Sequence, residues 1–192
     1  MADKTILCNT TKTTVFKYRE MINQRNRKAV VTFIRQRFAE RYLAPIEAIP
    51  NKPKDLRNGF CTMAICCLMI ETLASFWKGR KETPRGEGAN TFIWFFAQSQ
   101  NVSLADLKGY GAQFYTNVRC GILHQGETKN GWIIRRDGRL FDPNTLTVNA
   151  TKFHRALSKC LDAYCKELET SAWDGPTWLA FRLKMDTICQ NC

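Results

Sequence analysis

The chain has 192 residues, which is enough for a single domain with a sizeable buried core. A hydrophobic content of 44% excludes a disordered tail, and no uninterrupted apolar run reaches the roughly 18 residues of a membrane span. The net charge of +12 indicates a polyanionic partner, with nucleic acid as the first candidate, although a merely basic soluble protein has the same balance.

The cysteines indicate a reducing compartment. Their number, nine, is odd, and three of them fall inside an apolar helix pattern, which disfavours a disulfide framework. No secretory segment is recognised near residue 1. We therefore expect a cytoplasmic protein without a membrane segment, whose thiols are mostly free and buried. The cysteines are Cys8, Cys61, Cys66, Cys67, Cys120, Cys160, Cys165, Cys189 and Cys192.

Two long helices are predicted in the first half of the chain. Residues 13–43 carry apolar side chains at three- to four-residue spacing, which is typical of an amphipathic helix. Residues 56–77 carry a stronger apolar stripe, and Gly79 follows as a C-cap. The loop between these helices is predicted from three prolines: Pro45, Pro50 and Pro53.

The middle of the chain contains a short apolar segment and a further helix. Residues 91–97 are apolar all round, so periodicity leaves a buried helix and a strand equally open. Ser103 is predicted to cap a helix that begins at Leu104 and continues to a stop at Gly126.

In the last third of the chain the spacing of apolar residues changes from a helical to an alternating pattern. Residues 131–142 alternate around Asp137-Gly138, which predicts a two-stranded hairpin. Helices are then predicted to open at Asn149 or Thr151 and again at Asp174. The predicted fold is therefore all-α: a helical bundle in one domain, residues 1–192, with a small β-hairpin insertion before the last helices.

An arginine and a histidine lie close together where the predicted middle helix ends, in the segment Arg119-Cys-Gly-Ile-Leu-His124. Arginine is a permanent phosphate-binding cation and histidine ordinarily titrates near neutral pH, so the two supply the minimum chemistry for cutting RNA without a metal. Residues five apart on an ideal helix are separated by about 140°, however, and do not share one face.

Three arrangements would still join the two side chains: unwinding near Gly121 or Gly126, a swing of the long arginine, or a second copy across a dimer axis. The alternative is that Arg119 is a surface cation and His124 a C-terminal histidine stabilised by the helix dipole.

The sequence of residues 119–127, Arg-Cys-Gly-Ile-Leu-His-Gln-Gly-Glu, resembles the Arg-x4-His motif of the HEPN superfamily. The resemblance implies a helical bundle that dimerises, so that two motifs form one composite cleft. It also implies metal-independent RNA cleavage that leaves a 2′,3′-cyclic phosphate. In that reaction His124 acts as general base on a ribose 2′-hydroxyl or as general acid on the leaving oxygen, and Arg119 holds the phosphate.

Neighbouring residues complete the candidate site. Many catalytic HEPN members carry Asn or Asp directly after the arginine, whereas this chain carries Cys120, either a weak donor or, as we favour, a packing residue. Glu71, inside an apolar helix, is expected either to orient Arg119 or His124 or to lie at a solvated edge. Two polar residues near the motif are supporting candidates: Asn117 and Gln125.

Basic residues near the predicted hairpin are candidates for RNA binding: Lys129, Arg135, Arg136 and Arg139. They are predicted to form a phosphate-tracking surface with cations of the first helix, although a solvated basic face is an equal alternative. Those first-helix cations are Arg25, Arg27, Lys28, Arg35 and Arg37.

Neither a metal nor another cofactor is expected. Cys189 and Cys192 form one Cys-x2-Cys pair, with His154, Cys160 and Cys165 upstream, but a zinc ribbon needs two well-spaced pairs. The sequence also lacks the glycine pattern of a phosphate-cradling loop.

The sequence thus favours a dimeric, metal-independent endoribonuclease of HEPN type that acts on RNA in the cytoplasm, as a toxin or antiviral defence effector with a possible neutralising or regulatory protein partner. Two other functions stay open. One is a non-catalytic RNA- or nucleotide-binding or scaffold module of the same fold. The other is a structural subunit whose basic face contacts an acidic protein.

Overall fold

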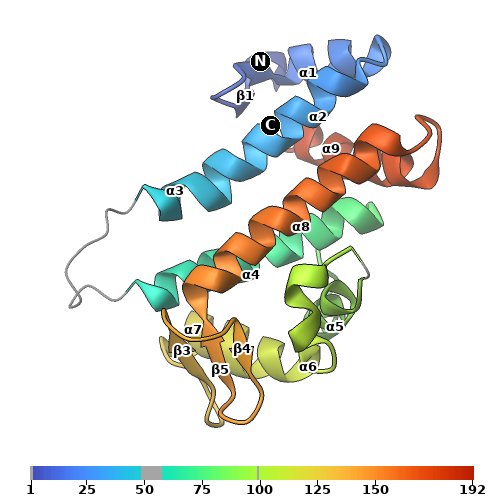
Figure 1. Ribbon diagram of the computed structural model, residues 1–192. Helices are drawn as coiled ribbons and strands as arrows, with labels where there is room; N and C mark the ends of the chain where they lie inside the picture. Colours follow the sequence, from blue (N-terminus) through green and yellow to red (C-terminus); the bar gives the residue numbers. More distant parts are fainter. Residues whose placement is uncertain (1, 49–57, 99) are drawn as a thin grey trace.

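The computed structural model describes residues 2–48, 58–98 and 100–192, and most of this chain is helical (Figure 1). The predicted mainly helical class is therefore confirmed. Figure 1 shows α2 (Arg27–Phe38) and α8 (Ala150–Thr170) running alongside each other, with α4 (Gly59–Lys78) behind α8. Both chain ends lie near α2, and a small sheet lies at the opposite end.

The single helix predicted for residues 13–43 is wrong, because the chain breaks at Arg25. That residue has a positive φ of 52°, and the Asn26 side chain then caps α2 by accepting a hydrogen bond from the Ala29 backbone N–H. The elements of this region are η1 (Ala2–Lys4), β1 (Ile6–Cys8), β2 (Thr13–Thr14), α1 (Val15–Asn23), α2, the π-helical η2 (Ala39–Leu43) and α3 (Ala44–Glu47).

The predicted loop after residue 43 begins later than expected. Pro45 occupies the first turn of α3, where a missing backbone N–H costs no helical hydrogen bond, so the helix continues to Glu47. Three residues used in the prediction lie outside the described ranges: Pro50, Pro53 and Leu56.

Helix α4 is the central element of the core. It contacts α8, α9 (Pro176–Gln190) and α5 (Gly88–Ala97), and it ends at Gly79, whose left-handed φ of 62° confirms the predicted C-cap. Among the described helices α4 alone has the length and apolar composition of a membrane span, but most of that stretch is buried inside the protein, as in a core helix.

The apolar residues 91–97 belong to helix α5 and not to a strand. The continuous helix predicted from Leu104 is wrong, because Gly109, with a φ of 92°, separates a short 3-10 helix from the rest. Beyond Gly109 the helix runs without a break to its predicted stop at Gly126. The elements here are η3 (Val102–Leu107), α6 (Gly111–Phe114), the π-helical η4 (Tyr115–Arg119) and α7 (Cys120–Gln125).

The predicted hairpin of residues 131–142 is replaced by a three-stranded sheet in the order β3-β5-β4. The strands are β3 (Ile133–Arg135), β4 (Phe141–Asp142) and β5 (Thr147–Asn149). Gly138 does turn the chain, with a φ of 76°, but β5 lies between the two predicted partners, parallel to β3 and antiparallel to β4. The buried Val148 explains this order, because β5 contributes a core side chain that the alternation of residues 131–142 does not reveal.

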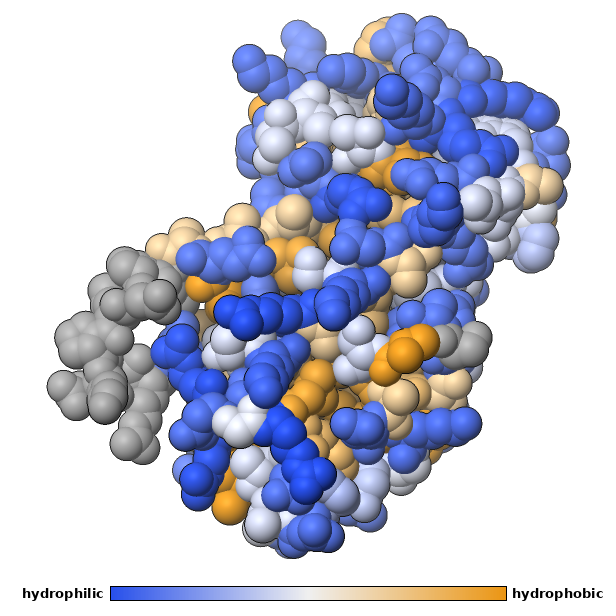
Figure 2. Space-filling view, in the orientation of Figure 1, coloured by the Kyte–Doolittle hydropathy of each residue, from blue (hydrophilic) through white to orange (hydrophobic). Residues whose placement is uncertain are grey.

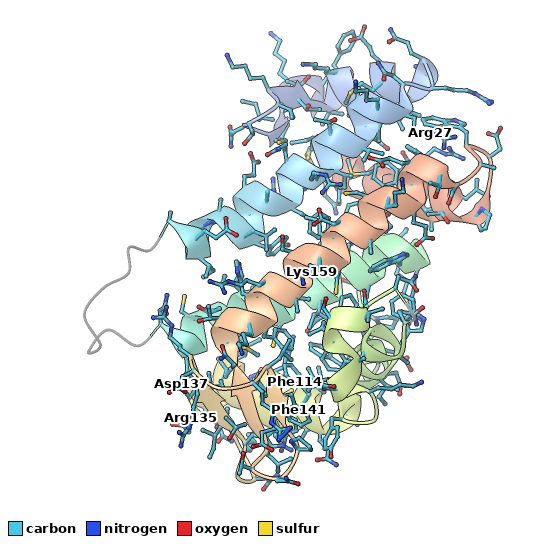
Figure 3. All side chains as sticks on the ribbon, in the orientation of Figure 1. Arg27, Phe114, Arg135, Asp137, Phe141 and Lys159 are labelled. Carbon is cyan, nitrogen blue, oxygen red and sulfur yellow. The ribbon has the colours of Figure 1, made fainter. Side chains whose placement is uncertain are left out.

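Aromatic side chains fill the part of the core next to the sheet. Phe114 is fully buried and its ring stacks on Phe153 of α8 and Phe92 of α5, with ring centroids 5.3 and 5.7 Å apart. The Trp132 ring meets it edge-on at 5.8 Å. Figure 3 shows Phe114 and Phe141 at this lower end of the molecule. Phe114 therefore ties α6, and the motif helix that follows it, to α5, α8 and the sheet.

We predict that Phe114→Ala lowers the free energy of unfolding by about 3–5 kcal/mol, because it removes a fully buried ring and leaves a cavity. Phe16→Ala is the matched control, since Phe16 is 56% exposed and its loss should cost less than about 1 kcal/mol. Urea unfolding followed by circular dichroism measures both values. Equal losses for the two variants would contradict this role of Phe114.

Candidate functional site

The structure brings Arg119 and Glu71 together. The Arg119 Nε–H donates to Glu71 Oε1 over 2.8 Å, and the two side chains are only 19% and 20% exposed. Glu71 is the one carboxylate within the apolar helix α4, so the half-buried pair neutralises an acidic group at the edge of the core. The expected contact between Glu71 and the motif is thus with its arginine.

The guanidinium of Arg119 also lies near Tyr115 and Cys120. Its central carbon lies 5.4 Å from the centre of the Tyr115 ring, which is a cation–π geometry. Burial by itself lowers the pKa of Arg119, but the hydrogen bond and the charge of Glu71 outweigh it and raise that pKa. Burial, followed by the nearby Cys120 thiol, raises the pKa of the Tyr115 hydroxyl. Both groups therefore keep their protons, and Arg119 stays a cation.

Local backbone features explain how the motif is held. The π-helical turn η4 ends at Arg119, and such turns recur at functional sites. Gly126 adopts a left-handed φ of 68° and ends α7. The chain then folds back so closely that a Cβ on Gly121 would lie 2.5 Å from the Glu127 carbonyl oxygen. A glycine is therefore required at position 121 inside the motif.

His124 lies apart from this cluster. It is exposed near the end of α7, and no described residue forms a hydrogen bond or ion pair with it. Helix α7 is regular from Cys120 to Gln125, so the unwinding near Gly121 that would have joined the two motif residues does not occur. Within one chain Arg119 faces α4 while His124 faces outward, as the 140° separation predicts.

The supporting candidates fall into different roles. Asn117 is buried, its side-chain oxygen accepts from the Asn130 amide and its carbonyl accepts from the Lys129 N–H, so it holds the returning loop. Gln125 is exposed at the end of α7, close in sequence to His124. Cys120 is partly buried, and its thiol interacts with the side chains of both Arg119 and Tyr115, so it belongs to the polar cluster around the arginine.

The three arginines of the small sheet are exposed, but two already have polar partners. The Arg136 Nε–H donates to Thr151 Oγ1 at 3.4 Å, and an Arg139 terminal nitrogen lies 3.7 Å from Asp142. Arg135 lies at the sheet end of the molecule, beside Asp137 (Figure 3).

Most arginines expected to extend this surface from the first helix are committed to other contacts. Arg25 pairs with Asp174, Arg35 pairs with Asp162, and the buried Arg37 donates to the Leu7 carbonyl. Arg27 donates to the Glu169 carbonyl. Two of these arginines, Arg25 and Arg35, are therefore neutralised, whereas Arg27 and Arg37 keep their charge but are held by backbone carbonyls.

Sequence reasoning missed two features. Tyr115 stands four residues before Arg119, a spacing that places both on one helical face and signals the contact. The second feature is a row of exposed cations on α8, which was interpreted only for its apolar face. These cations recur at helical spacing and are Lys152, Arg155, Lys159 and Lys166.

The described residues contain no group of three or more His, Cys, Asp or Glu side chains that could hold a metal ion. Cys189 is buried and Cys192 is exposed. His154 is also buried, where desolvation lowers its pKa, and its Nε2 atom has no partner in the described parts of the chain.

Comparisons of the chain with protein-family models, with curated proteins and with solved structures found no match. The resemblance to the HEPN motif therefore rests on residues 119–127 themselves, and the function has to be argued from the contacts of those residues.

We predict an energetic coupling of about 1–2 kcal/mol between Glu71 and Arg119, because either residue alone leaves a half-buried charge without its partner. A double-mutant cycle of Glu71→Ala and Arg119→Ala in urea unfolding measures it. The exposed pair Arg25–Asp174, with side chains 64% and 70% exposed, is the control and should couple by less than about 0.5 kcal/mol. Equal coupling in the two pairs would refute a special role for the Glu71 contact.

Proposed function

We propose that the protein is a dimeric, metal-independent endoribonuclease of HEPN type. The observation that carries the proposal is the division of labour within the motif: Arg119 is held in place by Glu71, whereas His124 is exposed on the following turn without a partner among the described residues. A positioned cation and an accessible imidazole are the two groups that metal-free cleavage of RNA requires.

The proposed reaction uses these groups in defined roles. A neutral His124 takes the proton of a ribose 2′-hydroxyl while the 2′-oxygen attacks the adjacent phosphorus. The bond to the 5′-oxygen breaks, and a protonated histidine returns a proton to that oxygen. Glu71 occupies only the Nε edge of Arg119, so the terminal amino groups bind the phosphate and offset its developing charge. The products carry a 2′,3′-cyclic phosphate and a free 5′-hydroxyl.

A second copy supplies the missing geometry. Arg119 and His124 of one chain lie on different faces of the helix, so a dimer in which two α7 helices meet brings the histidine of one copy to the arginine of the other. Apolar side chains support this face as an interface. Leu68 lies one turn from Glu71 on α4 and Leu123 one turn from Arg119 on α7, and they are 42% and 40% exposed.

In a cell this activity fits a cytoplasmic toxin or defence effector. The free and mostly buried thiols agree with a reducing compartment. A neutralising protein would then act by covering the exposed His124 or by separating the two copies.

A specific observation favours a second candidate, a non-catalytic RNA-binding module. Arg119 is half-buried and already contacts Glu71, Tyr115 and Cys120, so its charge is partly compensated before any phosphate arrives. If the wild-type chain binds RNA with a steep salt dependence but cuts none of a mixed pool of RNAs, this candidate replaces the nuclease.

We predict that His124→Ala and Arg119→Ala each slow RNA cleavage by at least about 100-fold while leaving RNA affinity within a few-fold of wild type. Cleavage of end-labelled RNA in EDTA, analysis of the product ends and fluorescence anisotropy give the three readouts. Thr116→Ala, an exposed polar position on the same helix, is the control and should cut at the wild-type rate. Wild-type rates in both motif variants would end the nuclease proposal.

A further inference from the structure

Helix α8 presents a row of cations on its outward side. Its four basic residues before the last turn are all exposed, and at 100° per residue they fall within an arc of about 60°. From the first to the last they extend about 21 Å along the helix at 1.5 Å per residue. We name this row the α8 stripe: Lys152, Arg155, Lys159 and Lys166.

Packing determines where the α8 stripe points. The opposite side of α8 carries buried side chains such as Phe153, Leu157 and Leu161, and the helix packs against α4 and α2, so its outward side is determined. Figure 2 shows hydrophilic residues interspersed with hydrophobic ones on the face over which α8 runs, and Figure 3 places Lys159 near the middle of α8. The stripe is thus a fixed feature of the surface.

The stripe keeps its charge. One acid, Asp162, lies among the four cations, and it is neutralised by Arg35 of α2. The ion pairs among the described residues all involve other side chains. Within these ranges, no carboxylate oxygen therefore lies within 4.0 Å of the charged groups of the stripe. Arg136 extends the row at its sheet end through its contact with Thr151 at the start of α8.

The chemistry of the stripe suits a phosphate backbone. Proteins that bind single strands stack the bases on exposed aromatic rings in a groove. Here the surface is a convex helix and not a groove. Among the large exposed apolar side chains of the described residues the one aromatic ring is Phe16, which belongs to α1 and not to α8. Double-stranded RNA instead presents phosphates and 2′-hydroxyls with its bases stacked inside, and it is recognised by shape and charge.

We propose that the α8 stripe binds the backbone of base-paired RNA. This inference rests on the proposed ribonuclease function, and the substrate class is then a stem with an unpaired flank or loop. The stripe extends about 21 Å along α8, so its cations can reach more than one phosphate of a duplex backbone. Attack by a 2′-oxygen needs the leaving oxygen in line with it, and the regular A-form backbone does not allow this arrangement. The cut nucleotide therefore lies outside the stem that the stripe holds.

The test compares two charge-reversed variants in an uncleaving His124→Ala chain. Lys152→Glu with Lys159→Glu alters the stripe. Lys4→Glu with Lys12→Glu makes the same charge change at exposed N-terminal positions. Fluorescence anisotropy at several salt concentrations measures binding to an RNA hairpin and to an unstructured RNA of equal length, and thermal unfolding checks that all chains fold.

We expect the parent chain to bind the hairpin more tightly than the unstructured RNA. The stripe variant should lose about tenfold or more in hairpin affinity, and its slope of log affinity against log salt should fall by about 2, one for each phosphate contact. The control variant should stay within about threefold of the parent.

Three results would overturn the proposal: equal losses in the stripe and control variants, equal or tighter binding of the unstructured RNA, or displacement of the hairpin by polyglutamate at equal charge concentration. The outcomes separate the two proposals. A wild-type chain that binds hairpins through the stripe but never cuts RNA retains this inference and loses the ribonuclease, whereas cutting with no effect of the stripe variant does the reverse.

Discussion

Helix α4 has to be covered on most of its circumference, because nearly all of its side chains between Gly59 and Lys78 are apolar. The rest of the chain is arranged to do this. Helix α8 covers one side, α9 and α5 cover others, and the motif helix α7 lies against it beside the small sheet. Helix α8 has one strongly apolar face, so covering α4 determines which of its side chains remain outside.

The one carboxylate inside α4 connects this core to the candidate site. A charge at the edge of a dry interior needs a partner, and Arg119 reaches Glu71 from the π-helical turn that precedes α7. Tyr115 and Cys120 complete the enclosure of the guanidinium. The same geometry that fixes Arg119 turns His124 outward, since α7 continues as a regular helix. In the ribonuclease that we propose, this requirement of the core also positions one of the two reacting groups, and a second copy provides the other.

The charge of the protein is distributed by the same packing. Several arginines of α2 are used in contacts within the chain, with the Asp162 carboxylate and with the backbone carbonyls of Glu169 and Leu7. The α8 stripe, by contrast, has no such partners among the described residues. Within the described ranges, positive charge without an acidic partner is thus exposed along the outer side of α8, where no other helix packs. Helices α7 and α8 both pack against α4, so the two proposed roles, chemistry at α7 and backbone recognition at α8, would share one support.

The sequence by itself determined the features that depend on neighbours a few residues away. The helical class, the apolar faces of α4 and α8, the glycine stops at Gly79 and Gly126 and the position of the motif all follow from spacing and capping. Tertiary structure decided what depends on distant partners. Glu71 and Arg119 are 48 residues apart, and the sheet order depends on where Val148 is buried. Free energy from such long-range burial and pairing exceeds local preference, which is why the hairpin and the first long helix were predicted wrongly and the α8 stripe was missed.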